Sequence, residues 1–400
     1  MIKIAVMGYG TIGSGVVEVL ETNRDSIAKR VGEEVEVKYV LDLRDFPGDP
    51  IEKKIVHDYK DITADEEVKI VVETMGGVEP AFTFVKAMLE AGKSVTTSNK
   101  ALVAEKGAEL LAVAKKKNVN FMFEASVGGG IPIIRSINEC LTADKIEEIT
   151  GILNGTTNYM LTRMANEGLE FADVLKDAQD KGYAEKDPTA DVEGFDACRK
   201  IAILTSLVAG KQVDFEKIHT EGITKISAVD FKYAKAMGRS IKLLATSRQA
   251  DGTYSALVAP HLLSPEHPLY SVNDVFNAVF VHGNVLGDAM FYGSGAGKLP
   301  TASAVVADVV EMAKHLDQNI PVEWSKEELP LADYKKNEKR FFVRTEADEA
   351  AVKAAFGEGE LVHADGISGE MGFVTGNMTE AVYEEKAAKL GKVLQMIRLT

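Results

Sequence analysis

At 400 residues, the chain is long enough to form two or three domains. Hydrophobic residues make up 46% and charged residues 27%, which is ordinary for a soluble globular protein, and no apolar run is long enough to span a bilayer. The net charge of -15 argues against nucleic acid or an anionic membrane as the main partner. With only Cys140 and Cys198, a disulfide scaffold or a cysteine zinc site is not expected. We therefore expect a cytoplasmic enzyme without a signal peptide.

A short apolar strand at residues 2–7 leads directly into a glycine-rich turn. The turn reads Gly8-Tyr9-Gly10-Thr11-Ile12-Gly13, and an apolar helical run follows it. Between a first strand and a first helix, the first glycine allows a tight turn and the second lets a pyrophosphate approach the backbone. The third lets the helix pack closely on the strand. The N–H groups at the helix start would then hold the phosphates. The motif therefore predicts a dinucleotide-binding site.

The second predicted strand, residues 35–41, ends in two residues that bear on the choice of cofactor. An acid at this position would bind the ribose 2′-OH of NAD, whereas an arginine would take the 2′-phosphate of NADP. Asp42 stands at the strand tip, and Arg44 follows two residues later. We favour NADP, with NAD as the alternative.

Strands and helices continue to alternate up to about residue 125, which is the pattern of a doubly wound parallel sheet of the Rossmann type. Lys100 directly follows the strand predicted at 94–97, and another strand is predicted at 120–125. Strand ends in this fold face the ligand, and a helix N-terminus disfavours a cation. Lys100 is therefore a candidate active-site residue.

A run of glycines, 128–130, interrupts this alternation. Consecutive glycines permit unusual torsions, so main-chain oxygens could point at one centre and hold a hard cation. From the residues alone, a hinge between two domains is the better interpretation.

The second domain is predicted to be α+β, with helices and an open sheet. Its strands have a more antiparallel pattern and are expected at 146–153, 241–248, 254–261, 277–281 and 289–292. The turn Asn154-Gly155-Thr156-Thr157-Asn158 leads into a helix, which Thr156 could cap unless its hydroxyl binds a ligand carboxylate. A second glycine-rich loop, at 293–297, precedes a helix at about 302–315 that we expect to pack back on the first domain.

Residues 182–200 pass from a turn-rich loop into a helix at 195–209. Gly182 and Asp187-Pro188 break helices, because proline disfavours helical torsions in the residue before it. Apolar residues at helical spacing follow.

This loop and helix bring together charges of opposite sign. The loop presents Glu185 and Asp191, and Lys200 lies one helical turn after Asp196 on the same face. Carboxylates can hold the ammonium group of a small zwitterion, and a lysine can transfer a proton. For any single residue the alternative is an ordinary solvated ion pair. The spacing as a whole favours a catalytic site.

The polar, proline-containing segment 317–339 is predicted to be a linker. Residues 340–400 then alternate in the order βαββαβ, which indicates a small ferredoxin-like module. The predicted organisation has a nucleotide-binding domain at 1–130, completed by a returning helix at about 300–316. A substrate and oligomerisation domain occupies 131–299.

With these motifs in hand, the chain resembles homoserine dehydrogenases. The signature is formed by Ala178, Gly182-Tyr183-Ala184, Asp187-Pro188, Asp191-Val192, Gly194, Asp196 and Lys200. The resemblance extends to residues 8–13, 97–103, 127–132, 154–158 and 295–297, so it covers about residues 1–315. The tail resembles, in shortened form, the regulatory ACT module often appended in this family.

The resemblance implies NAD(P)-dependent interconversion of L-homoserine and L-aspartate 4-semialdehyde, a step of threonine and methionine biosynthesis. It implies Lys200 and Lys100 as catalytic residues, with Lys200 as proton donor or acceptor. Substrate-binding residues would be Glu185, Asp191, Asp196, Thr156 and Tyr183. Cofactor-binding residues would be Gly8, Tyr9, Gly10, Thr11, Ile12, Gly13, Arg44, Thr97, Ser98, Lys100, Gly182 and Gly297.

The resemblance also implies a structural sodium or potassium ion, in place of a simple hinge. It would be held mostly by main-chain oxygens of Glu124, Val127, Gly129 and Ile131. An open second sheet and a small tail module favour a homodimer or homotetramer. Whether the tail binds an effector stays open, because residues 345–349 replace the Asp-x-Pro-Gly type of loop.

Two other functions stay open. An aldehyde dehydrogenase acting through a thioester would require a cysteine nucleophile, and Cys198 is the candidate, although it lies on the helix face away from Lys200. A non-catalytic nucleotide-sensing regulator, with the tail as its ligand-binding module, would leave Lys200 and its carboxylates without a purpose.

Overall fold

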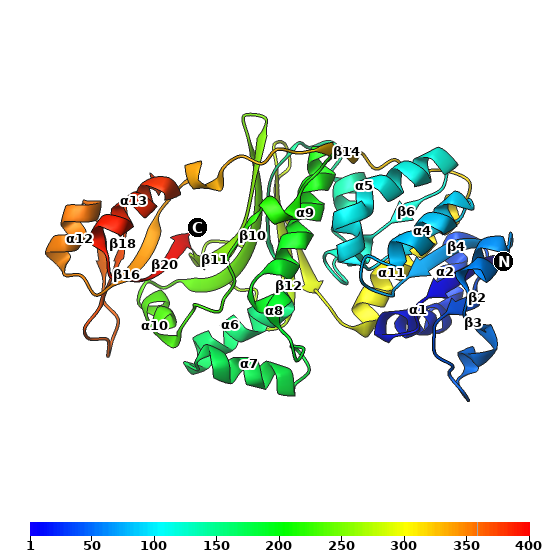
Figure 1. The fold of residues 1–400 in the computed structure, drawn as a ribbon, viewed down its shortest axis with the longest axis horizontal. Helices are drawn as coiled ribbons and strands as arrows, with labels where there is room; N and C mark the ends of the chain where they lie inside the picture. Colours follow the sequence, from blue (N-terminus) through cyan, green and yellow to red (C-terminus); the bar gives the residue numbers. More distant parts are fainter. Residues whose placement is uncertain (358) are drawn as a thin grey trace. The chain divides into compact units, whose positions relative to one another are not determined.

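The computed structural model describes residues 1–357 and 359–400, which divide into two compact units (Figure 1). The first unit consists of Met1–Lys145, Ala202–Phe215 and Gly293–Leu329. The second unit consists of Ile146–Ile201, Glu216–Tyr292 and Pro330–Thr400. Within the described residues, no helix combines the length and the apolar character needed to cross a membrane.

The first unit is built on a six-stranded parallel sheet in the order β3-β2-β1-β4-β5-β6. Its strands are β1 (Ile2–Met7), β2 (Val35–Leu41), β3 (Ile55–Val56), β4 (Val68–Glu73), β5 (Ser94–Thr97) and β6 (Phe121–Met122). The strand order reverses between β1 and β4, and ligands of doubly wound sheets bind at the carboxyl ends of strands at such a reversal. The predicted Rossmann-type sheet is confirmed.

Helices cover this sheet and bury its apolar side chains. They are α1 (Thr11–Thr22), α2 (Arg24–Val31), α3 (Tyr59–Ala64), α4 (Ala81–Glu90), α5 (Lys100–Lys117) and α11 (Lys298–Lys314). The helix predicted at about 302–315 therefore begins one turn earlier, at Lys298. It packs against α1, where Val305 and Val309 share one buried cluster with Ile4 and Val16.

The strand predicted at 120–125 is wrong in its second half. Only β6 pairs with β5, and Glu124–Ser126 forms a 3₁₀ turn. The Glu124 carboxylate accepts the N–H groups of Ile134 and Arg135, at 2.8 Å each, and Glu124 N donates to Asp308 at 3.0 Å. These contacts with distant residues draw the chain out of the sheet.

The second unit contains a largely antiparallel ten-stranded sheet, whose main path runs β13-β12-β7-β10-β11-β20-β16-β18-β17. Its first strands are β7 (Ile146–Ile152), β10 (Ser240–Ala250), β11 (Thr253–Leu263), β12 (Phe276–Gly283) and β13 (Gly287–Ser294), and β9 (His219–Thr220) pairs with β11. The accompanying helices are α6 (Gly155–Glu167), α7 (Phe171–Asp180), α8 (Thr189–Val192), α9 (Phe195–Ala209) and α10 (Ala228–Ala236). Helix α9 belongs to this unit only up to Ile201, and its remaining residues belong to the first unit. The α+β prediction for this part of the chain is confirmed.

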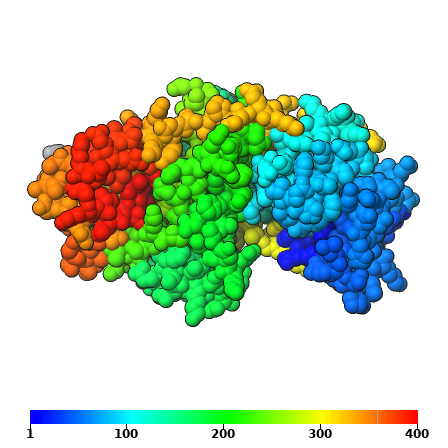
Figure 2. Space-filling model, viewed as in Figure 1, coloured from blue at the N-terminus to red at the C-terminus, as the bar shows by residue number. Residues whose placement is uncertain are grey.

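The C-terminal residues complete the same sheet. They form β16 (Phe341–Thr345), α12 (Glu349–Phe356), β17 (Glu360–Val362), β18 (Met371–Val374), α13 (Glu380–Leu390) and β20 (Val393–Leu399). The strand order β20-β16-β18-β17 is that of a ferredoxin-like βαββαβ module. In Figure 2 its orange-to-red surface adjoins the green surface of the rest of the second unit.

Two buried arginines tie this module to the rest of the second unit. Arg398 of β20 pairs with Glu380 and donates to Glu221 at 2.7 Å, and β20 itself pairs in parallel with β11. Arg344 of β16 donates to Asp230 of α10 at 2.7 Å. The module therefore shares both a sheet and buried charges with its own unit, whereas its assignment as an ACT regulatory module stays a prediction.

Four further short strands form two separate pairs. They are β8 (Lys211–Gln212), β14 (Ser325–Glu328), β15 (Glu338–Lys339) and β19 (Met378–Thr379), which pair as β14 with β8 and β15 with β19. The segment 317–339, predicted to be a linker, thus contains β14 and β15.

Candidate functional site

The glycine turn of the first unit has the geometry that a bound pyrophosphate requires. Gly8 adopts a φ of +93°, which favours glycine, and a Cβ on Gly13 would lie only 1.9 Å from the Gly8 carbonyl oxygen. Around a Cβ on Gly10, no described atom lies within 4 Å. Helix α1 then begins at Thr11 without an acidic residue in its first turn. These residues fit a dinucleotide, because close packing and open space fall where the motif needs them.

Asp42 and Arg44 form one paired group at the end of β2. The Asp42 carboxylate accepts Tyr9 N at 2.8 Å, and both the main-chain N and the Nε of Arg44 at 3.0 Å. The Arg44 guanidinium holds the pKa of Asp42 at about 2. Arg44 is 62% exposed, and its guanidinium lies 5.0 Å from the Phe46 ring centroid. The Asp42 carboxylate is therefore ionised and paired with the guanidinium group of Arg44, which is itself exposed.

The end of β5 places Lys100 at the start of α5. The buried Thr97 hydroxyl donates to the buried Glu73 carboxylate and accepts Asn99 N at 2.9 Å. The Asn99 side chain caps α5, so Lys100 is the first residue of this helix, and Ser98 is half-buried beside it. Lys100 occupies the strand-end position that the sequence predicts.

The other predicted cofactor residues lie on different segments. Tyr9, Thr11 and Ile12 belong to the glycine turn and α1, and Gly297 precedes α11 with a φ of +115°. Gly182 belongs to the second unit, where it follows α7 with a φ of +73°.

The glycine run at 128–130 lies close to the second glycine-rich loop within the first unit. Gly129 has a φ of +57°, and a Cβ there would lie 2.3 Å from Gly295 O. Gly130 N donates to Ser294 O at 3.0 Å. The close approach of these two segments of the main chain therefore requires glycine at position 129. Within the described residues, no group of three or more histidine, cysteine, aspartate or glutamate side chains forms a metal site.

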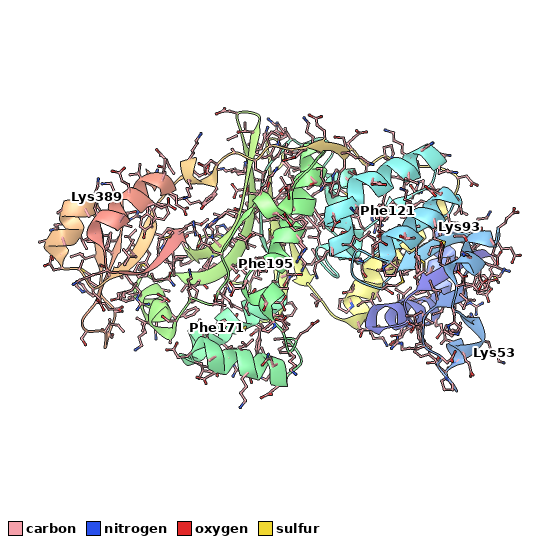
Figure 3. All side chains as sticks on the ribbon, viewed as in Figure 1. Lys53, Lys93, Phe121, Phe171, Phe195 and Lys389 are labelled. Atoms are coloured by element: carbon pink, nitrogen blue, oxygen red, sulfur yellow. The ribbon has the colours of Figure 1, made fainter. Side chains whose placement is uncertain are left out.

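In the second unit, Lys200 is buried among oxygen atoms. Its Nζ lies 2.8 Å from Asp196 Oδ2 and donates to the Leu153 carbonyl oxygen at 2.7 Å. Lys200 is 8% exposed and Asp196 4% exposed. Both residues come from α9, whose first residue, Phe195, is labelled in Figure 3. The ion pair predicted one helical turn apart is confirmed, and it is not a solvated surface pair.

Asn154 completes this cluster, and the sequence did not single it out as a functional residue. Its Nδ2 donates to Asp191 Oδ1 at 2.7 Å and to Asp196 Oδ2 at 3.0 Å. Its Oδ1 accepts Thr157 N at 2.8 Å, so Asn154 caps α6. An asparagine between a strand and a helix is a recognisable capping signal. The bridge to two aspartates far along the chain leaves no such signal.

Of the two roles left open for Thr156, capping α6 is ruled out, because Asn154 is the N-cap residue. The Thr156 hydroxyl instead donates to Tyr183 O at 2.6 Å. Tyr183 is 46% exposed, and its ring packs edge-on against Tyr159 with centroids 4.9 Å apart. Glu185 is exposed on the loop that this contact anchors. The predicted substrate residues therefore form a buried group around Lys200 and an exposed group on the loop.

Cys198 does not suit a thioester mechanism. It is 3% exposed, and burial raises the pKa of its thiol. A nucleophilic cysteine needs the opposite, because the thiolate is the reactive form.

A Rossmann-type sheet with this glycine turn defines a dinucleotide-binding protein. A buried lysine–aspartate pair is suited to proton transfer at a hydroxyl or carbonyl oxygen. The class that these features define is a nicotinamide-dependent oxidoreductase acting on a CH–OH group.

Comparisons with known proteins identify the family. A family model described as "Homoserine dehydrogenase" matches residues 132–310, and one described as "Homoserine dehydrogenase, NAD binding domain" matches residues 8–124. The homoserine dehydrogenase of Bacillus subtilis is 42% identical to this chain, over 79% of this chain and 73% of its own.

Solved structures agree. A homoserine dehydrogenase from Thiobacillus denitrificans matches with a TM-score of 0.90 and 34% identity, over 100% of this chain and 98% of its own. A hyperthermophilic archaeal homoserine dehydrogenase in complex with NADPH matches with a TM-score of 0.68 and 27% identity, over 80% of this chain and 99% of its own. The chain belongs to the homoserine dehydrogenase family, whose reaction is the NAD(P)-dependent interconversion of L-homoserine and L-aspartate 4-semialdehyde. The nucleotide-sensing regulator receives no support.

Two glycine variants are predicted to have different defects, one in stability and the other in cofactor affinity. Gly13→Ala places a Cβ 1.9 Å from Gly8 O, so α1 must shift and the melting temperature falls. Gly10→Ala adds a methyl group to open space, so the protein folds normally. The methyl group obstructs the pyrophosphate, however, and the Kd for NADPH rises at least ~10-fold. Thermal melts and fluorescence titrations measure the two quantities. A Gly10→Ala protein with native affinity would contradict the assignment.

Proposed function

We propose that Lys200 is the group that exchanges a proton with the substrate oxygen. The nicotinamide supplies or accepts the hydride, so the chain must supply a proton to the aldehyde oxygen in one direction and remove it from the alcohol in the other. The observation that carries the proposal is the burial of the Lys200 ammonium between Asp196 and Leu153 O, at 2.8 and 2.7 Å. An ammonium group held in a known position is a good donor for a developing alkoxide.

The surrounding acidic side chains suit the amino-acid part of the substrate. Both substrates carry an α-ammonium group, and carboxylates recognise it with charge-assisted hydrogen bonds. We assign this role to Asp191 and Glu185, while Asp196 holds Lys200.

The loop after α7 would close around the rest of the substrate. A hydrogen bond of 2.6 Å joins Thr156 to Tyr183, so a movement of this loop would displace the start of α6. We place Thr156 and Tyr183 among the substrate contacts on this basis. Lys100 is proposed as a second catalytic residue, on its position at the carboxyl end of β5.

Lys200→Met is predicted to lower kcat at least ~100-fold in both directions, because it removes the proton donor and acceptor. The Kd for NADPH should stay native. Lys200→Arg keeps the positive charge but cannot transfer the proton. It should therefore be as inactive as Lys200→Met, with a higher melting temperature. Lys389→Met, at an exposed lysine 2.7 Å from Glu385 one helical turn away, is the matched control and should be close to native. Turnover of either Lys200 variant within ~10-fold of native would refute the role.

We propose NADP as the preferred cofactor. Asp42 is already saturated by its hydrogen bonds from Tyr9 and Arg44, whereas Arg44 is 62% exposed and can face a 2′-phosphate. The archaeal homoserine dehydrogenase solved with NADPH supports the same choice.

Arg44→Ala tests this preference. Loss of a charged hydrogen bond costs ~1.5–3 kcal/mol, so kcat/KM for NADP should fall roughly 10- to 100-fold. For NAD it should hold or rise, because Asp42 becomes available to the ribose hydroxyl. Arg24→Ala, at an exposed arginine 3.0 Å from Glu34, is the control. Equal losses with both cofactors would contradict the proposed role of Arg44.

We also propose a monovalent cation near the glycine run. Candidate ligands are the main-chain oxygens of Glu124, Val127, Gly129 and Ile131. The Glu124 carboxylate is occupied by Ile134 N and Arg135 N, so this residue would contribute only its carbonyl. The positive φ of Gly129 supports the proposal, because it turns the main chain sharply at this point.

Replacing sodium and potassium with choline at constant ionic strength should lower both activity and the melting temperature, if the ion is structural. Restoring either metal ion should recover both. Unchanged values in choline buffer would remove the ion from the proposal.

The homodimer or homotetramer stays a prediction. β13 ends the path of the ten-stranded sheet, and its Met290 and Tyr292 side chains are 46% and 54% exposed. An edge strand with exposed apolar side chains is compatible with self-association.

A further inference from the structure

Two carboxylates of the second unit converge on a single amide group. Asp191 lies on α8 and Asp196 on α9, and both accept a hydrogen bond from Asn154 Nδ2, at 2.7 and 3.0 Å. Asn154 is 6% exposed and Asp196 4%. Like charges this close repel each other, and burial strengthens the repulsion. A shared donor between them offsets it.

The orientation of this amide is determined by its other end. Asn154 Oδ1 accepts Thr157 N at 2.8 Å and lies 3.0 Å from Thr157 Oγ1. Turning the amide over would point its oxygen at two carboxylates and its NH₂ group at a backbone N–H. The start of α6 therefore holds the donor toward the aspartates, and α6 and α8 lie side by side (Figure 1).

The same strand end also holds the lysine. Leu153, directly before Asn154, accepts the hydrogen bond from Lys200 Nζ at 2.7 Å. Asp196 Oδ2 receives both Lys200 Nζ, at 2.8 Å, and Asn154 Nδ2, at 3.0 Å. A displacement of Asn154 would therefore move Asp196 and, through it, the ammonium group.

We propose that Asn154 is a positioning residue for the dehydrogenase reaction: its amide holds Asp191 and Asp196 together and thereby fixes Lys200 for proton transfer. The inference rests on the proposed role of Lys200. Asn154 has two structural tasks, capping α6 and bridging the aspartates, and different substitutions separate them.

Asn154→Ser keeps the cap and removes the bridge, because serine is as good a capping residue as asparagine but reaches less far. Asn154→Ala removes both. Asn154→Asp keeps a capping oxygen and adds a third negative charge beside the two aspartates. If bridging matters, Ser and Ala should both lower kcat roughly 10- to 100-fold at saturating L-homoserine, and Asp should lower it further. The Ser protein should melt above the Ala protein, because it keeps the cap, although its kcat is lowered as much.

Asp348→Ser and Asp348→Ala provide the matched control. Asp348 caps α12 through Ala351 N at 2.8 Å, in the same unit, and bridges no charged groups in this cap. Both variants should keep native kcat, with a melting temperature lowered only in the alanine variant.

Three results would overturn the inference. Native kcat in Asn154→Ser would show that Asn154 only caps α6. A loss confined to KM would make it a substrate contact. If the loss of kcat paralleled the fall in melting temperature across the Ser, Ala and Asp variants, Asn154 would be a stabilising residue only. Turnover by Lys200→Met would instead refute the proposed function, so the two failures are distinguishable.

Discussion

The proposed catalytic site of the second unit depends on the buried ion pair between Lys200 and Asp196. Burying two charges costs several kcal/mol per ion, on the order of what a whole domain gains in net stability, unless their hydrogen-bonding groups are satisfied. Leu153 O and Asn154 Nδ2 provide this satisfaction. The end of β7 and helix α9 must therefore stay in register with each other, and that requirement also places Asp191.

A different constraint governs the first unit, where the main chain passes very close to itself. Only glycine fits at position 13, because any Cβ would meet Gly8 O at 1.9 Å. This packing places the start of α1 against the end of β1, where the strand order of the sheet reverses. The geometry of the glycine turn is thus a consequence of close packing at one glycine and open space at another.

The C-terminal module shows how a small βαββαβ unit can become part of a larger sheet. Arg398 is fully buried between Glu221 and Glu380, and β20 lies between β11 and β16. Burial raises the pKa of Glu221, but the hydrogen bonds from His219 and Arg398 outweigh this effect. The net result is a pKa well below the ordinary value. Its contribution to stability is therefore fully present above the ordinary glutamate pKa and is lost progressively as the pH falls below that value. Any effector of this module would act on a sheet that also contains β7, the strand before Asn154.

Much of the fold was predictable from local patterns. The strand at 94–97, the helix at 195–209 and the βαββαβ order of the tail match the structure, because periodicity and glycine or proline punctuation are short-range signals. The ion pair of Lys200 was predictable for the same reason, since its partner lies one helical turn away.

What the sequence by itself determined was therefore the Rossmann-type sheet, the glycine turn and the ion pair between Lys200 and Asp196. Tertiary structure alone decided that Asn154 bridges residues 37 and 42 positions away, that Arg44 is held on Asp42, and that Glu124 ends β6 early. These are hydrogen bonds set by where the chain has folded, and a bond between distant residues, or a choice between local partners, imposes no periodicity on the sequence. For that reason they become visible only in three dimensions.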